Sequence, residues 1–132
     1  MSALTEATTG DTWTRTYGPL TRTDIVRYAG ASGDFNKIHH DEPYAQSIGL
    51  PQVFSIGMFQ AGLVASCVTD HLGVENLRRI NFRFREQVWP GDELTCVATV
   101  VSVVSGRLTV DITCSRQTGG VAIGGTAEFL VG

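Results

Sequence analysis

The stretch SIGMFQAGLVASCVTDHL, residues 55–72, decides the fold of this chain. It is the most apolar helical segment of the sequence, and Gly73 is expected to end it. Apolar residues occur nearly all round the predicted helix rather than along one stripe. Such a helix is stable when other elements cover it, so we expect it to be buried on most sides.

The sequence after this helix alternates between apolar and polar residues with a period of two. From Leu77 to Trp89, the apolar face holds Ile80, Phe82 and Phe84, and the polar face holds Asn81, Arg83 and Arg85. This period is typical of a half-buried β-strand. Turn sequences separate the runs that follow, which predict three further strands over residues 93–104, 107–117 and 121–131.

One buried helix and a long run of strands predict a single α+β domain over residues 1–132. The strands are expected to form an antiparallel meander that wraps around the helix. A chain of 132 residues is long enough to bury a real core. The sheet of such a domain has exposed edges that a dimer can cover, so we expect a dimer rather than a monomer.

The N-terminal half is expected to be mainly helical. Residues 1–12 are polar and Thr-rich, and are predicted to be a loose lead-in. The predicted elements that follow are a strand at 13–17 and helices over 24–29 and 41–47. Thr21 or Thr23 is expected to cap the first helix, and Gly33 to release the chain from it. Asp41 is interpreted as the cap of the second.

Composition and charge exclude several classes of protein. Apolar residues make up 42% of the chain and charged residues 17%, which is typical of a globular domain. The net charge is −3 and no basic block occurs, which argues against nucleic acid as a partner. No apolar run reaches the length of a membrane span, and the N-terminus has no signal-peptide core. We therefore expect a cytoplasmic protein.

The three cysteines are predicted to be buried and inert. Cys67, Cys96 and Cys114 are odd in number and widely spaced, which favours neither a disulfide framework nor a zinc site. Each falls in an apolar helix or strand pattern, where a thiol behaves as a small apolar side chain. No metal site is expected.

Residues 34–39, DFNKIH, place a carboxylate, an amide and an imidazole within one short segment. Asp34 and His39 are a candidate acid/base pair, and the unperturbed pKa of histidine lies near neutrality. The alternative is local: Asp34 and Asn36 favour turn-capping positions, and His39 is then a loop histidine with a structural hydrogen bond. His40 is interpreted as a surface or structural residue.

Gly57 lies near the predicted start of the long helix. A helix N-terminus offers free backbone N–H groups and a positive dipole, which suit a developing oxyanion. The alternative is a glycine required only for close packing. Ser55 is predicted to be the N-cap of this helix.

The chain from about Leu20 onward resembles the MaoC-like (R)-specific enoyl-CoA hydratases and 3-hydroxyacyl dehydratases. The resemblance is carried by residues 28–41, by Gly49 and by Gly57-Met58, and is most specific over SGDFNKIHHD, residues 32–41. It implies a hot-dog fold. It further implies that Asp34 and His39 are catalytic, that Asn36 positions the reacting water, and that the Gly57 N–H holds the thioester oxygen.

The resemblance also implies the reaction. Members of this family add water with syn geometry across a trans-2-enoyl thioester, or remove it, and the product is the (R)-3-hydroxyacyl thioester. The acyl carrier is coenzyme A or acyl carrier protein, and no metal or redox cofactor is required. The family usually has proline where Lys37 stands and histidine where Ile56 stands.

Two other functions remain open from the sequence. The chain resembles subunits of heteromeric steroid-side-chain enoyl-CoA hydratases, in which it would bind the acyl chain or support the site of a second hot-dog subunit. The third reading is a hot-dog thioesterase, for which Asp70 lies near the far end of the helix that usually carries the acid.

Some residues are candidates for substrate contact. Phe54, Ser55 and Met58 flank the proposed oxyanion donor and are interpreted as substrate-binding. Arg83 and Arg85 are interpreted as a solvated strand face, with contact to the phosphates of coenzyme A as the alternative. The sequence does not identify the acyl group.

Overall fold

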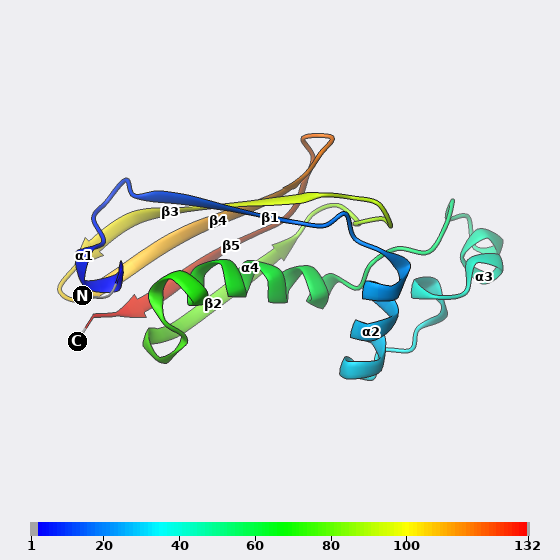
Figure 1. The fold of residues 1–132 in the computed structure, drawn as a ribbon, viewed down its shortest axis with the longest axis horizontal. Helices are drawn as coiled ribbons and strands as arrows, with labels where there is room; N and C mark the ends of the chain where they lie inside the picture. Colours follow the sequence, from blue (N-terminus) through cyan, green and yellow to red (C-terminus); the bar gives the residue numbers. More distant parts are fainter. Residues whose placement is uncertain (1–2, 132) are drawn as a thin grey trace.

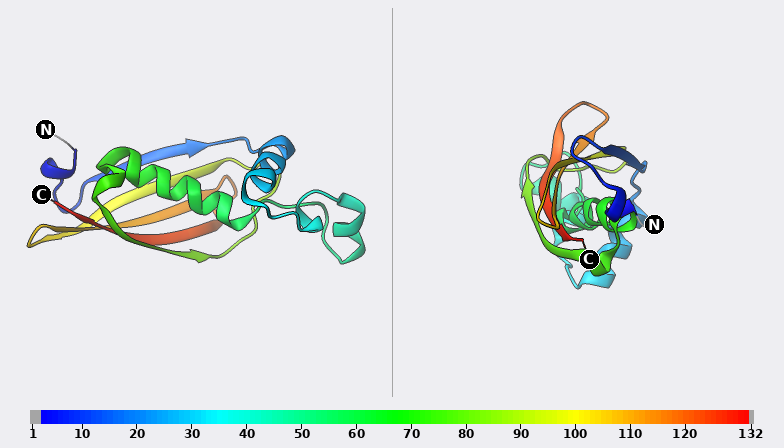
Figure 2. Two further views of the ribbon diagram at one scale, coloured as in Figure 1. Left: turned by 90° about the horizontal axis from the view of Figure 1, so that it is seen from below. Right: turned by 90° about the vertical axis from the view of Figure 1, so that its left-hand side faces the viewer.

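A five-stranded antiparallel sheet curves along one side of a long helix, α4 (Figures 1 and 2). The computed structural model describes residues 3–131, so residues 1, 2 and 132 of the predicted domain lie outside the described residues. The elements are α1 (Ala3–Glu6), β1 (Thr12–Tyr17), α2 (Arg22–Ser32), the 3-10 helix η1 (Lys37–His39), α3 (Glu42–Ser47), α4 (Gly57–Leu72), the 3-10 helix η2 (Val74–Asn76), β2 (Leu77–Phe84), β3 (Leu94–Val104), β4 (Arg107–Arg116) and β5 (Val121–Leu130).

Helix α4 packs its apolar face on the concave side of the sheet. Val64, Cys67 and Val68 are buried there against alternate residues of β3, β4 and β5. The opposite row of the helix, which includes Met58 and Gly62, is exposed. Burial on most sides was therefore overestimated, because within residues 3–131 the sheet covers the helix from one direction.

The strand order is β1-β3-β4-β5-β2. The predicted meander is correct for β3, β4 and β5, which tight turns connect, but β2 pairs with β5 at the edge rather than with β3. The predicted strand to Trp89 ends at Phe84. Residues beyond it turn away because the buried Val88 offers its carbonyl to the Ser55 N–H, 2.7 Å away, in the segment before α4.

The first residues differ from the predicted loose lead-in, because α1 buries Leu4 in the core. Helix α2 extends beyond the predicted 24–29. Thr21 is its N-cap, and its side chain and that of Asp24 exchange hydrogen bonds with each other's backbone N–H groups. Gly33 ends it with φ +77°, in the left-handed region that glycine adopts readily.

Helix α3 agrees with its prediction, since the side chain of Asp41 accepts a hydrogen bond from the Tyr44 N–H. Helices α2, η1 and α3 gather at one end of the molecule, the same end as the N-terminus of α4 (Figure 1). The two parts of the predicted site, residues 34–39 and Gly57, therefore meet at one end of the fold.

Candidate active site

His39 is held in one orientation by a backbone carbonyl. Its Nδ1 lies 2.7 Å from the carbonyl oxygen of Phe54, and the ring is buried, with 7% of the residue exposed. A carbonyl oxygen only accepts hydrogen bonds, so this partner assigns the proton of the neutral ring to Nδ1. Nε2 then carries the lone pair and is the basic nitrogen.

The basic nitrogen faces Asp34. The Nε2 atom of His39 lies 3.9 Å from Oδ2 of Asp34, and 43% of the aspartate side chain is exposed. This distance exceeds that of a direct hydrogen bond, and across such a gap a water molecule can bridge the two groups. The structure thus brings together the predicted acid/base pair at a position that solvent can reach.

The loop that carries the pair is built by its own side chains. Oδ1 of Asp34 accepts from the Asn36 N–H at 3.2 Å, and Oδ1 of Asn36 accepts from the Ile38 N–H at 3.2 Å, as the N-cap of η1. These two oxygen atoms therefore have the turn-capping role that the sequence offered as the alternative to catalysis. Because Asp34 uses Oδ1 for the turn, Oδ2 faces His39. A water at Asn36 can still bind its NH₂ group or the second lone pair of Oδ1.

Lys37 and His40, which flank His39, point away from the pair. The Nζ atom of Lys37 lies 5.6 Å from the centre of the Tyr44 ring on α3, a cation–π contact. Nε2 of His40 lies 3.2 Å from the Phe35 carbonyl oxygen, which agrees with the structural role predicted for His40.

Gly57 is the first residue of α4. The N-cap of α4 is Ile56, whose side chain forms no hydrogen bond to the helix. The first N–H groups of a helix have no partners within it, and the helix dipole adds positive potential there. A Cβ atom at Gly57 would lie 3.0 Å from the Phe84 ring, so glycine is needed for close packing as well. Both interpretations of Gly57 fit the structure.

A cavity of about 250 Å³ opens beside this helix start. Its lining includes Phe54, Ser55, Gly57, Gln60 and Phe84. The first three come from the predicted site. Gln60 and Phe84 were not predicted as site residues. Gln60 lies three positions after Gly57, on the same face of the predicted helix, and this spacing could have indicated it. No comparable sequence signal indicated Phe84.

Ser55 is not the N-cap of α4, contrary to the prediction. It is buried, and its hydroxyl donates to Oε1 of Gln60 at 2.6 Å. Ile56 occupies the cap position instead, so the Ser55 side chain points inward. Of the three predicted substrate contacts, Phe54 and Ser55 line the cavity, whereas Met58 does not and is 55% exposed.

Phe54 connects the two halves of the site. Its N–H donates to the Ile38 carbonyl at 3.3 Å, and its carbonyl oxygen faces Nδ1 of His39. Its ring meets the His39 ring edge-on, with centres 5.0 Å apart, and the same residue lines the cavity beside Gly57. The acid/base pair and the helix start are thus held together by one short segment.

The remaining candidates lie away from this site. Asp70 pairs with Arg15 on the surface, near the end of α4 opposite Gly57. The three cysteines are buried free thiols, and burial raises the pKa of Cys67. A hydrogen bond with Cys114, together with burial, raises the pKa of Cys96.

No group of three His, Cys, Asp or Glu side chains within residues 3–131 is arranged to hold a metal ion. In the same part of the chain, no helix has both the length and the apolar character needed to cross a membrane.

Comparison with known sequences finds relatives among hydratases. An (R)-specific enoyl-CoA hydratase of Rhodospirillum rubrum is 30% identical over 116 residues, which are 85% of this chain and 80% of the relative. The 3-oxo-4,17-pregnadiene-20-carboxyl-CoA hydratase beta subunit of Mycobacterium tuberculosis is 33% identical over 108 residues, 81% of this chain and 83% of the relative.

A third group of relatives is much longer. The fatty acid synthase beta subunit pkiC of Emericella nidulans is 33% identical over 94 residues, or 68% of this chain. The chain spans 5% of the length of that subunit and of a second fungal beta subunit, from Monascus ruber.

Among solved structures, the unliganded R-hydratase PhaJ1 from Pseudomonas aeruginosa superimposes with a TM-score of 0.89. The match covers 97% of this chain and 84% of the other, at 23% identity. This likeness confirms the predicted hot-dog fold. The model of the MaoC-like domain matches residues 5–119, most of the chain, and the chain therefore belongs to this family.

Proposed function

We propose that this chain is a hydro-lyase that adds water reversibly, with syn geometry, to a trans-2-enoyl thioester and forms the (R)-3-hydroxyacyl thioester. The observation that carries the proposal is the pair itself: Nε2 of buried His39 faces Oδ2 of Asp34 at 3.9 Å, next to the start of α4. The family and the named (R)-specific hydratase among its relatives support it. We expect the protein to act in the cytoplasm.

The mechanism follows from the two facing groups. A water between Asp34 and His39 loses its proton to Nε2 as its oxygen attacks the β-carbon of the substrate. The electron pair of the double bond moves toward the thioester, and the negative charge gathers on the thioester oxygen. The Gly57 N–H donates to that oxygen. The α-carbon then takes a proton from the pair on the same face, so the elements of one water are added. This acid/base route requires no cofactor.

The phenyl ring of Phe84 has a specific place in this scheme. It lies against Gly57 and lines the cavity beside it. A thioester whose oxygen reaches the Gly57 N–H must pass this ring, and an apolar cover removes water from the charge that develops there. Lys37 and Ile56 depart from the family pattern, but neither removes a group that this scheme uses.

The direct experiment incubates the purified chain with trans-2-enoyl-CoA substrates of short, medium, long and steroid-type acyl groups. We expect loss of the enoyl-thioester absorbance and formation of the (R)-3-hydroxyacyl thioester, identified by chiral chromatography. Free thiol is measured in the same samples. Release of thiol without hydrated product would instead indicate a thioesterase.

A second candidate function is that of one subunit in a heteromeric hydratase. One relative is named a beta subunit, and the site end of this chain exposes apolar side chains, with Phe35 66% and Met58 55% exposed. Apolar surface of this kind is typical of an interface. A homodimer that hydrates substrate unaided would support the first proposal. An inactive monomer that gains activity with a second hot-dog subunit would support the other.

A further inference from the structure

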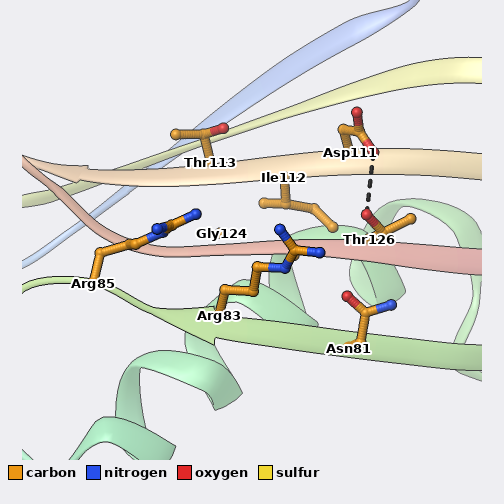
Figure 3. A pocket seen from close by; sticks show the side chains of 9 residues that line it. Asn81, Arg83, Arg85, Asp111, Ile112, Thr113, Gly124 and Thr126 are labelled. Carbon is orange, nitrogen blue, oxygen red and sulfur yellow. Dashed lines mark hydrogen bonds between the residues drawn. The ribbon is translucent and has the colours of Figure 1, made fainter.

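A second cavity, of about 400 Å³, lies on the face of the sheet opposite α4 (Figure 3). Polar residues of its lining follow residues that pack in the core. Arg83 follows the partly buried Phe82 on β2, and Thr113 follows the buried Ile112 on β4. Gly124 of β5 pairs with both Arg83 and Thr113 and lies between them. We call this cavity the sheet groove.

Two arginines in the sheet groove have no protein partner. Within residues 3–131, neither the Arg83 nor the Arg85 guanidinium forms a hydrogen bond or an ion pair. In the same range, Arg27 and Arg79 also lack a side-chain partner but do not line the groove, whereas Arg15, Arg22, Arg107 and Arg116 each pair with a carboxylate. In Figure 3 both side chains extend from β2 toward β5 and β4. Guanidinium groups gathered at one cavity are suited to phosphate.

Two consecutive positions of β5, 124 and 125, differ in whether close packing requires glycine there. A Cβ atom at Gly125 would lie 2.6 Å from the carbonyl oxygen of Asn81, so close packing requires glycine there. A Cβ atom at Gly124 would meet nothing closer than the Ile112 carbonyl oxygen at 3.8 Å. Glycine weakens a strand, and packing does not require it at position 124. Its structural effect is to leave the sheet groove open between Arg83 and Thr113.

The sheet groove carries opposite charges at its two ends. Arg85 lies at one end, and Asp111 and Asn81 line the other, where Oδ1 of Asp111 accepts from the Thr126 hydroxyl at 3.2 Å. Arg83 lies between the two ends (Figure 3). A ligand that fits both ends has an anionic group and, separated from it, a hydrogen-bond donor. A nucleotide has both, in its phosphates and its base amine.

The sheet groove and the cavity of the candidate active site share one lining residue. Arg85 lines both the groove and the cavity beside Gly57, and Phe84 and Glu86 on either side of it line the latter. A long flexible ligand can therefore run from the helix start around the end of β2 into the groove.

We propose that the sheet groove binds the nucleotide end of coenzyme A, with phosphates on Arg83 and Arg85 and the base amine toward Asp111 and Asn81. The pantetheine arm passes Arg85 to bring the thioester to Gly57. This inference rests on the proposed function and names its carrier. A carrier protein supplies a single phosphodiester and no base, so it would leave the acidic end of the groove without a ligand.

Calorimetric titration with coenzyme A tests the groove without catalysis. Arg83→Gln removes one guanidinium, and Gly124→Leu fills the groove where a side chain has room. Arg79→Gln is the matched control, an exposed arginine of the same strand outside the groove. We expect each groove variant to weaken binding by about tenfold or more, and the control by less than about twofold. Equal affinity in all four proteins, or no binding to the wild type, would overturn the proposal.

Kinetics separates this inference from the reaction itself. With an enoyl-CoA, Arg83→Gln should raise KM by about tenfold and leave kcat unchanged, because the groove lies away from the reacting atoms. With the matching enoyl-pantetheine, which lacks the nucleotide, variant and wild type should be equal. If Arg83→Gln impairs only an acyl-carrier-protein substrate, the carrier assignment is wrong. If no thioester is hydrated, the proposed function fails, and the calorimetry still decides whether the groove binds coenzyme A.

Discussion

One contact that is distant in the sequence fixes the orientation of the His39 ring, which is the base in the proposed reaction. Its partner on Nδ1 is the carbonyl of Phe54, fifteen positions further along the chain. This hydrogen bond to an uncharged carbonyl holds the ring so that Nε2 faces Asp34. Any substitution that moves residues 54–57 should therefore change both the base and the helix start.

Ser55→Ala tests the support beneath this segment. The buried Ser55 hydroxyl donates to Oε1 of Gln60, and its loss leaves that oxygen without this donor. We expect the free energy of unfolding to fall by about 1–3 kcal/mol. Ser47→Ala is the matched control, since the Ser47 hydroxyl bonds the Tyr44 carbonyl at an exposed position and should cost less than about 0.5 kcal/mol. Urea denaturation measures both, and equal losses would contradict the role assigned to Ser55.

Gly57→Ala tests the contact between the helix start and Phe84. The added Cβ would lie 3.0 Å from the ring, so the ring must shift and the cavity beside it changes shape. We expect kcat/KM for an enoyl-CoA to fall about tenfold, since small displacements near reacting atoms are costly. The double variant Gly57→Ala with Phe84→Leu should recover part of that loss, because the smaller side chain makes room. A double variant worse than the product of the two single effects would count against a steric cause.

At the scale of elements, the predictable parts are those set by neighbours in the sequence. Strands β3, β4 and β5 follow from period-two patterns and tight turns, and the cap of α3 follows from Asp41. The proximity of Asp34 and His39 was also predictable, since both lie within one short loop. These features depend on contacts over a few residues.

The partner of β2 was not predictable in this way. Strand β2 pairs with β5, and the segment after Phe84 forms a hydrogen bond to the loop before α4. Both contacts join residues that are far apart in the sequence. The Ser55 cap failed for a related reason: its hydroxyl has a buried partner in Gln60 that local preference does not reveal. The sheet groove likewise needs the register that brings Gly124 beside Arg83.

The turn after Trp89 makes a pH-dependent contribution to stability. Asp92 is buried; burial alone would raise its pKa, but hydrogen bonds from Arg116, the Trp89 N–H and Gln117 hold that pKa below its usual value. A carboxylate whose pKa is lowered by folding makes its full contribution to stability when the pH is above its pKa in the unfolded chain, about 3.9. That contribution is lost as the pH falls through the folded value.

Asp92→Asn should therefore lower the free energy of unfolding at neutral pH by about 2 kcal/mol or more. The difference from the wild type should narrow below about pH 4, where the wild type loses the same interaction. Asp111→Asn, at an exposed position with a single side-chain hydrogen bond, serves as the control. Denaturation at several pH values measures both variants. A difference that stays constant with pH would show that the charge of Asp92 does not matter.

At the scale of the whole molecule, the fold divides its tasks between two regions. The sheet and the buried face of α4 form the core, while α2, η1 and α3 stand at one end and hold the acid/base loop against the N-terminus of α4 (Figure 1). The rigid helix start and the loop are joined through Phe54. The proposed active site lies at the end of the molecule, apart from the residues that form the core.

In the proposed reaction, Asp34 and His39 act together on a water molecule at an enoyl thioester. The most direct test is the hydration rate of one enoyl-CoA with Asp34→Asn, His39→Gln and the adjacent control His40→Gln. We expect each of the first two to lower kcat by about 10²–10⁴-fold, because an acid/base group is lost, and the control to remain near the wild type. Turnover close to the wild type in both Asp34→Asn and His39→Gln would contradict the account.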